Sequence, residues 1–88
     1  MVSTKSDQVL ATIARLSGRE AASLAREDDL VVDLGMDSPA ALELLVEIEG
    51  LLDLEIRDED ASRLHSVGDI LDYVETHDSM DVRRLRRR

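Results

Sequence analysis

The 88-residue sequence contains no cysteine, no tryptophan and no phenylalanine, and it has only two histidines. Without cysteine the chain can form neither a disulfide nor a cysteine-ligated metal site. The two histidines, His65 and His77, are too far apart in the sequence to form a ligand pair on one helix. The composition therefore excludes a disulfide scaffold and predicts no metal centre.

The sequence also lacks long hydrophobic runs and a secretory signal. No apolar run is long enough to span a membrane. Residues 1–7 lack the basic region and the apolar stretch of a signal peptide. We therefore expect a cytoplasmic protein with no membrane partner. A chain of 88 residues forms one domain with a thin core, which leaves no room for a deep enclosed active site.

Basic residues are scarce in most of the chain. The sequence has 11 Lys and Arg against 20 Asp and Glu, a net charge of -9, and five of the arginines follow Val82. The part before Val82 therefore has 6 basic and 20 acidic residues, a net charge of -14. Such a surface repels nucleic acid and attracts basic protein surfaces. An acidic face kept only for solubility is the alternative.

Apolar residues recur at helical spacing in four segments, and nothing alternates like a strand. The segments cover about residues 6–17, 38–52, 58–64 and 67–77. Gly18 is placed to end the first, Asp58 to cap the third, and Ser66 with Asp69 forms a capping-box pattern before the fourth. This pattern predicts an all-α fold, a small four-helix bundle with a long first loop and a short third helix. The residues expected inside are Leu10, Ile13, Leu34, Leu45, Ile48, Val67 and Ile70.

The connection between the first two segments, about residues 18–37, is long and apolar. Long loops in compact domains are usually either functional or disordered. This one is too apolar for disorder, since it contains Leu24, Leu30, Val31, Val32 and Leu34. We expect it to pack across the helices and to position the start of the second segment. Residues 79–88 are polar and basic and predict a disordered tail, which leaves residues 1–78 as the domain.

Ser38 lies between Asp37 and Pro39 at the start of the second segment. Proline is favoured in the first turn of a helix, and Asp37 and Ser38 are both good N-cap types. Taken alone, these residues indicate that Ser38 is a helix cap. No Gly-x-Ser-x-Gly elbow surrounds it and no histidine is near it in sequence, so a serine hydrolase is disfavoured. A calcium loop starting at Asp29 also fails, because Leu34 stands where glycine is required.

Three stretches, read together from Leu30 to Val74, indicate a known family. They are DLGMDS at 33–38 followed by ALEL at 41–44, the acidic stretch LEIRDED at 54–60, and SVGDILDYV at 66–74. No gap interrupts them. The chain resembles the acyl carrier protein family in all three.

The resemblance implies a carrier, not an enzyme. Ser38, with Asp37 as its motif neighbour, would receive 4'-phosphopantetheine from coenzyme A and hold acyl intermediates as thioesters on that arm. The partners implied are a phosphopantetheinyl transferase and acyl-loading and acyl-processing enzymes with basic docking surfaces. Neither nucleic acid nor a second copy of the chain is expected as a partner. The family's recognition helix maps to residues 38–52, where the recognition residues would be Glu43, Val46, Glu47 and Glu49.

The chain also departs from the family pattern. Pro39 replaces the usual leucine after the modified serine, which affects the expected partner set and not the attachment. Phenylalanine is absent, and we expect Leu30 and Leu52 to fill its places in the core. Pro39 and the arginine-rich tail favour polyketide or other specialised metabolism, with fatty acid synthesis also open. Two alternatives are an aminoacyl or peptidyl carrier and, from another class, an acidic helical adaptor without a prosthetic group.

Overall fold

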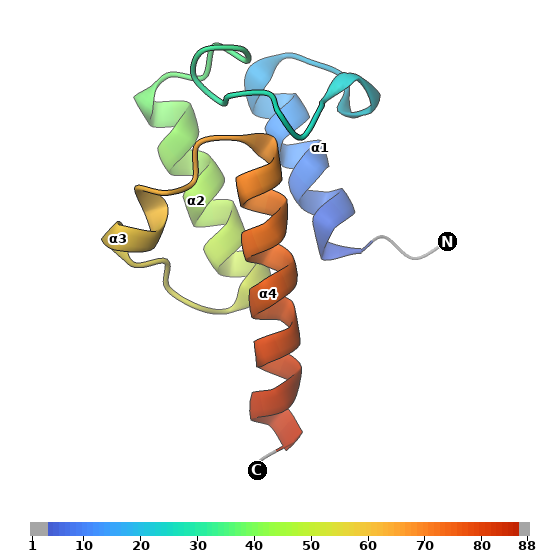
Figure 1. The fold of residues 1–88 in the computed structure, drawn as a ribbon, viewed down its shortest axis with the longest axis vertical. Helices are drawn as coiled ribbons and strands as arrows, with labels where there is room; N and C mark the ends of the chain where they lie inside the picture. The colour runs from blue at the N-terminus through green and yellow to red at the C-terminus, as the bar shows by residue number, and fades with distance from the viewer. Residues whose placement is uncertain (1–3, 87–88) are drawn as a thin grey trace.

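The computed structural model describes residues 4–86 and the side chains of residues 4–77. It contains four α-helices, α1 (Lys5–Ser17), α2 (Ser38–Leu52), α3 (Asp58–Ala61) and α4 (Val67–Arg86), with a short 3-10 helix η1 (Ala21–Ser23) in the first loop (Figure 1). The described residues contain no β-strand. The predicted all-α bundle with a long first loop and a short third helix is confirmed, whereas η1 was not predicted.

Helix α1 begins and ends at residues whose chemistry fits those positions, and α4 begins at such a residue. Thr4 caps α1, its hydroxyl accepting a hydrogen bond from the Asp7 N–H at 3.0 Å. Gly18 ends α1 with a φ of 73°, a left-handed conformation that glycine adopts at little cost. Before α4, Ser66 Oγ accepts from the Asp69 N–H and an Asp69 carboxylate oxygen accepts from the Ser66 N–H. The predicted capping box is therefore formed.

Two helix boundaries differ from the sequence prediction. The short helix α3 is capped at Arg57 without a side-chain bond, so Asp58 is its first helical residue and not its cap. Helix α4 continues to Arg86 although we expected it to end near His77. Residues 78–86 contain neither glycine nor proline, and leucine, methionine and arginine favour helix. The division into a domain of residues 1–78 and a tail of residues 79–88 stays a prediction, and the side chains of residues 78–88 lie outside the described part.

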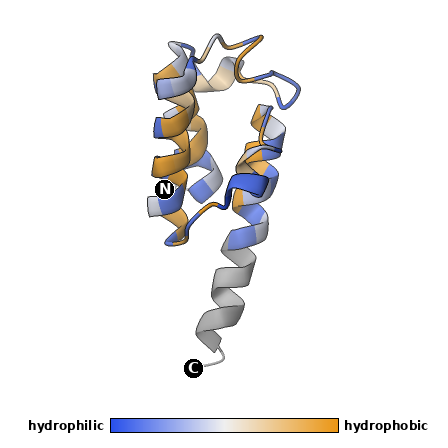
Figure 2. Cartoon of the chain, turned by 90° about the vertical axis from the view of Figure 1, so that its left-hand side faces the viewer, coloured by the Kyte–Doolittle hydropathy of each residue, from blue (hydrophilic) through white to orange (hydrophobic). Residues whose placement is uncertain are grey.

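The core lies where α1, α2 and α4 pack together. On α2, only the stripe of Leu44, Ile48 and Leu52 is fully buried, although the helix is hydrophobic along most of its length (Figure 2). The expected core residues Leu10 and Leu45 are only partly buried, since Val9 and Leu44 take the inward positions beside them. The cluster of buried core residues consists of Val9, Ile13, Leu30, Leu34, Met36, Leu44, Ile48, Leu52, Ile56, Val67, Ile70 and Val74. Leu30 and Leu52 thus lie in the core, as expected.

Candidate functional site

The first loop places Ser38 by burying apolar residues on its way to α2. Leu30, Leu34 and Met36 are all buried, while Gly35 between them has a φ of 69°. This positive φ lets the chain turn back toward the start of α2, a conformation that a side chain would strain. Met36 is the last buried residue before the helix, only two positions from Ser38. The prediction that this loop packs across the helices and positions the start of α2 is confirmed.

Asp29 holds the middle of the loop in a compact turn. One of its carboxylate oxygens accepts hydrogen bonds from the N–H groups of Val32 at 2.8 Å and Val31 at 2.9 Å. These two bonds, that of Val32 first, lower the pKa of Asp29. The Asp29 N–H in turn donates to the Asp33 carboxylate at 2.7 Å. The turn leading to Ser38 is therefore fixed by its own polar groups.

Backbone hydrogen bonds fasten the loop to the start of α4. The Leu30 N–H donates to the carbonyl oxygen of His65 at 2.8 Å, and the Gly68 N–H donates to that of Arg26 at 2.9 Å. A Cβ at Gly68 would lie 3.1 Å from that same carbonyl oxygen, so a larger residue would require the loop to shift by a few tenths of an ångström. The Arg26 guanidinium also meets the Asp72 carboxylate at 2.9 Å. The loop is thus seated on α4 at several points.

Asp37 and Ser38 have separate positions at the start of α2. Asp37 is the N-cap, and its carboxylate accepts from the Ala40 N–H at 3.0 Å. Ser38 is the first helical residue and Pro39 the second. Ser38 is exposed, and its hydroxyl makes no hydrogen bond to any described residue. The interpretation of Ser38 as a cap is therefore wrong, because Asp37 has that role and leaves the serine hydroxyl available for chemistry.

Few backbone donors remain at this helix start. Pro39 has no N–H, the Ala40 N–H is taken by the Asp37 side chain, and the Ala41 N–H donates to the Asp37 carbonyl oxygen at 2.9 Å. The Ser38 N–H remains without a partner among the described residues. A phosphate on Ser38 would gain the positive end of the helix dipole but little direct hydrogen bonding from the backbone. The site therefore fits an attached phosphodiester that stays in solvent.

Exposed apolar side chains occur both in the loop before Ser38 and on α2 after it. Val31 and Val32 in the loop are 61% and 80% exposed, and Leu42 and Val46 on α2 are 63% and 58% exposed. Val46 is thus exposed, as its predicted contact role requires. Leu42 and the two valines were not among the residues predicted to lie in the core, and they are exposed. The turn that Asp29 holds directs the valines outward, and one stripe of α2 is enough to fill the core.

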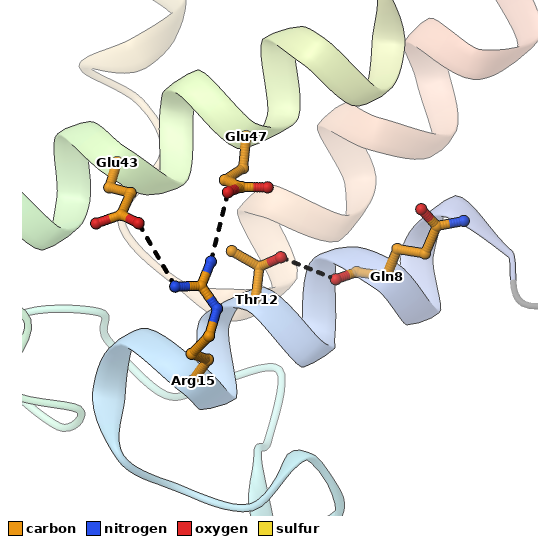
Figure 3. Close-up of polar contacts among 5 residues, drawn as sticks. All are labelled: Gln8, Thr12, Arg15, Glu43 and Glu47. Carbon is orange, nitrogen blue, oxygen red and sulfur yellow. Dashed lines mark hydrogen bonds and ion pairs between the residues drawn. The ribbon is translucent and has the colours of Figure 1, made fainter.

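The three predicted recognition glutamates have different surroundings. Glu43 and Glu47 are about half exposed, and both meet the Arg15 guanidinium of α1, at 3.5 and 3.4 Å (Figure 3). Glu49 is partly buried, and its carboxylate accepts from the Ile56 N–H at 2.8 Å. Glu49 therefore does not point freely outward, and its role in partner recognition stays a prediction. The sequence analysis predicted no role for Arg15. The only signal in the sequence was a basic residue on one predicted helix and a pair of acidic residues on another.

The described residues offer no catalytic constellation around Ser38. No group of three His, Asp or Glu side chains in this part of the chain could hold a metal ion. His65 lies in the loop before α4 and contributes its carbonyl oxygen to Leu30. No helix among the described residues is long and apolar enough to cross a membrane. What the fold and the site define is a small helical domain that presents one exposed serine at the start of a helix with acidic and apolar side chains.

Comparisons with known proteins agree with this description. The family described as "Phosphopantetheine attachment site" matches residues 7–74. An acyl carrier protein of an Exiguobacterium species is 36% identical over 64 residues, covering 73% of this chain and 81% of that protein. That of Clostridium acetobutylicum is 35% identical over 71 residues, covering 81% and 92%, and that of Helicobacter pylori is 36% identical over 69 residues, covering 78% and 88%.

A solved structure shows the same fold. A Mycobacterium tuberculosis chain described as an acyl carrier protein superposes with a TM-score of 0.74 at 30% identity, covering 83% of this chain and 97% of that one. The present chain belongs to the acyl carrier protein family. Phosphopantetheine is the prosthetic group of that family's attachment-site domain.

Proposed function

We propose that Ser38 is the residue that carries 4'-phosphopantetheine, and that the chain delivers acyl groups bound to that arm. The observation that supports this best is the separation of roles at the start of α2. Asp37 caps the helix, so the Ser38 hydroxyl is exposed and free of internal hydrogen bonds. In the attachment reaction Ser38 Oγ would bond to the pantetheine phosphorus of coenzyme A, 3',5'-ADP would leave, and a base of the transferase would take the hydroxyl proton.

The residues around Ser38 fit this group. The positive end of α2 favours an anion there, by about 0.3–1 kcal/mol. With only the Ser38 N–H left as a backbone donor, the phosphodiester is not gripped, and the arm can reach different enzymes in turn. The arm supplies the terminal thiol for thioester formation, which a chain without cysteine cannot provide itself. The protein contributes position and recognition and no acid, base or nucleophile to the reactions of the cargo.

The exposed side chains of α2 support the proposed partners. The transferase and the acyl-loading and acyl-processing enzymes would meet α2 with basic side chains toward Glu43 and Glu47 and apolar ones toward Val46 and Leu42. Because the cargo is tethered to the docked carrier, its effective concentration at the partner enzyme is high. The supply of acyl groups from polyketide or other specialised metabolism, or from fatty acid synthesis, stays a prediction, as does the cytoplasmic location.

The test is a labelling experiment with a matched control. The wild type, Ser38→Ala and Ser6→Ala are incubated with coenzyme A, Mg²⁺ and a broad-specificity phosphopantetheinyl transferase, and their intact masses are measured. Ser6 is a good control because it too lies in the first turn of a helix and its hydroxyl makes no hydrogen bond to a described residue. We expect the wild type and Ser6→Ala to gain one arm and Ser38→Ala to gain none.

The stability of Ser38→Ala separates a carrier serine from a structural one. Because Asp37 is the cap, Ser38→Ala should change the free energy of unfolding by less than about 0.5 kcal/mol, as is usual for surface substitutions. Asp37→Ala should cost about 0.5–2 kcal/mol, as is usual for a lost cap. A wild type that gains no mass, or a Ser38→Ala variant that still does, would show that the attachment site is wrongly assigned.

A further inference from the structure

Arg15 is the side chain of α1 that meets the acidic face of α2. Its two terminal nitrogens lie 3.5 Å from a Glu43 carboxylate oxygen and 3.4 Å from a Glu47 carboxylate oxygen (Figure 3). One turn earlier, the Thr12 hydroxyl donates to the Gln8 carbonyl oxygen at 3.1 Å and so stays on its own helix. Among the described residues, Arg15 is therefore the cation that bridges Glu43 and Glu47, two of the three predicted recognition acids.

The bridge explains why two glutamates can stand four residues apart on α2. Like charges at that spacing repel each other, and a guanidinium between them offsets the repulsion. The side chains of Arg15, Glu43 and Glu47 remain 55%, 52% and 49% exposed, respectively. Both nitrogen–oxygen distances are long for a charged hydrogen bond. Contacts of this kind exchange readily with solvent and with other ions. Arg15 therefore pairs with Glu43 and Glu47, but the two ion pairs are weak.

We propose that Arg15 is an internal competitor of partner enzymes, holding Glu43 and Glu47 until a basic side chain of the partner replaces it. The proposal rests on the proposed carrier function and adds a residue that sets docking strength. A basic residue of a partner finds the two carboxylates already neutralised in part, so each docking event must displace the guanidinium. Arg15 keeps association weak enough for a carrier that must leave one enzyme and reach the next.

The experiment measures the KM of a phosphopantetheinyl transferase for the apo carrier at low ionic strength, with wild type, Arg15→Gln and Arg57→Gln. Arg57 is a matched control because it is also an exposed arginine in an ion pair, with Glu59 at 2.9 Å, but it lies before α3. Both variants change the net charge by the same amount. We expect Arg15→Gln to lower KM about two- to five-fold, the range that exposed ion pairs support, and Arg57→Gln to change it far less.

A double-mutant comparison tests whether the effect passes through the two acids. In a background with Glu43→Gln and Glu47→Gln, Arg15→Gln should no longer lower KM, because the groups it competes for are gone. In the wild-type background, the decrease in KM caused by Arg15→Gln should also become smaller as NaCl is raised toward 0.5 M. The reason is that the screening length, about 10 Å at 0.1 M, shortens further. Melting curves of all variants show whether the fold is retained.

The outcomes separate this proposal from the carrier function. If the wild type is labelled but Arg15→Gln matches either the wild type or Arg57→Gln in KM, Arg15 is not a competitor and the carrier function stands. An equal decrease in KM in the background with Glu43→Gln and Glu47→Gln would show a general charge effect and would also overturn the proposal. If no variant is labelled at all, both the carrier assignment of this site and the proposal that rests on it are wrong.

Discussion

The Glu49 carboxylate on α2 binds a backbone N–H of this chain and is not free to meet a partner protein. It accepts the Ile56 N–H at 2.8 Å from seven residues away and so fastens the turn between α2 and α3. Glu43, also on α2, meets only the exposed Arg15. The two glutamates look alike in sequence, and only the path of the chain after Leu52 brings a backbone donor to one of them. Their substitution should therefore have different consequences.

We predict that Glu49→Lys lowers the free energy of unfolding by about 1–2 kcal/mol, because it leaves a partly buried N–H without its acceptor. Glu43→Lys should stay within about 0.5 kcal/mol, the usual range for an exposed position. Glu49→Gln keeps an acceptor and should lie between the two. Urea unfolding followed by circular dichroism measures all three. Equal stability of Glu49→Lys and Glu43→Lys would mean that the Ile56 bond contributes nothing.

At the scale of helices, the C-cap of α2 is Asp53, whose φ of 56° is left-handed. Its N–H donates to the Glu49 carbonyl oxygen, as a C-terminal cap does. Glycine adopts this conformation without strain, and an aspartate carboxylate also stands unfavourably near the negative end of the helix dipole. Both the backbone and the charge of this residue therefore weaken the end of α2.

Asp53→Gly should raise the melting temperature by roughly 4–8 °C, which corresponds to about 1 kcal/mol in a domain of this size. Asp53→Ala removes the charge but keeps the strained φ, so it should gain less or lose stability. Differential scanning calorimetry of the three proteins separates the two causes. If Asp53→Ala is stabilised as much as Asp53→Gly, the charge and not the backbone conformation is what matters at this position.

Helix starts and ends could be read from the sequence where a local signal exists. The range of α2, the Gly18 end of α1 and the Ser66–Asp69 capping box are all local patterns. The inward face of α2 could not be read, because α2 is apolar on more than one side and packing against α1 and α4 selects a single stripe. The Arg15 bridge could not be read for the same reason, since it joins residues on two helices 28 and 32 positions apart.

At the scale of the whole molecule, acidic residues outnumber basic ones far beyond what internal pairs can neutralise. Before Val82 the chain has 20 acidic and 6 basic residues. Among the described residues, three arginines form ion pairs with carboxylates: Arg15, Arg26 and Arg57. The folded state gathers the remaining carboxylates over a small surface, whereas the unfolded chain spreads them apart. Repulsion of this kind lowers the stability of the folded state.

Because salt screens repulsion over a Debye length of about 10 Å at 0.1 M and less above it, NaCl should stabilise this protein. We expect the melting temperature to rise by several degrees, about 3–8 °C, between 0.02 and 0.5 M NaCl, equivalent to roughly 1 kcal/mol. Mg²⁺ at matched ionic strength should act in the same direction. A variant with Glu20→Gln and Glu55→Gln removes two exposed carboxylates that make no hydrogen bond or ion pair with a described residue. It should melt higher at low salt and respond less to NaCl, since less repulsion remains to be screened. A melting temperature indifferent to salt in the wild type, or an equal salt response in the variant, would show that crowding of carboxylates does not limit the stability of this fold.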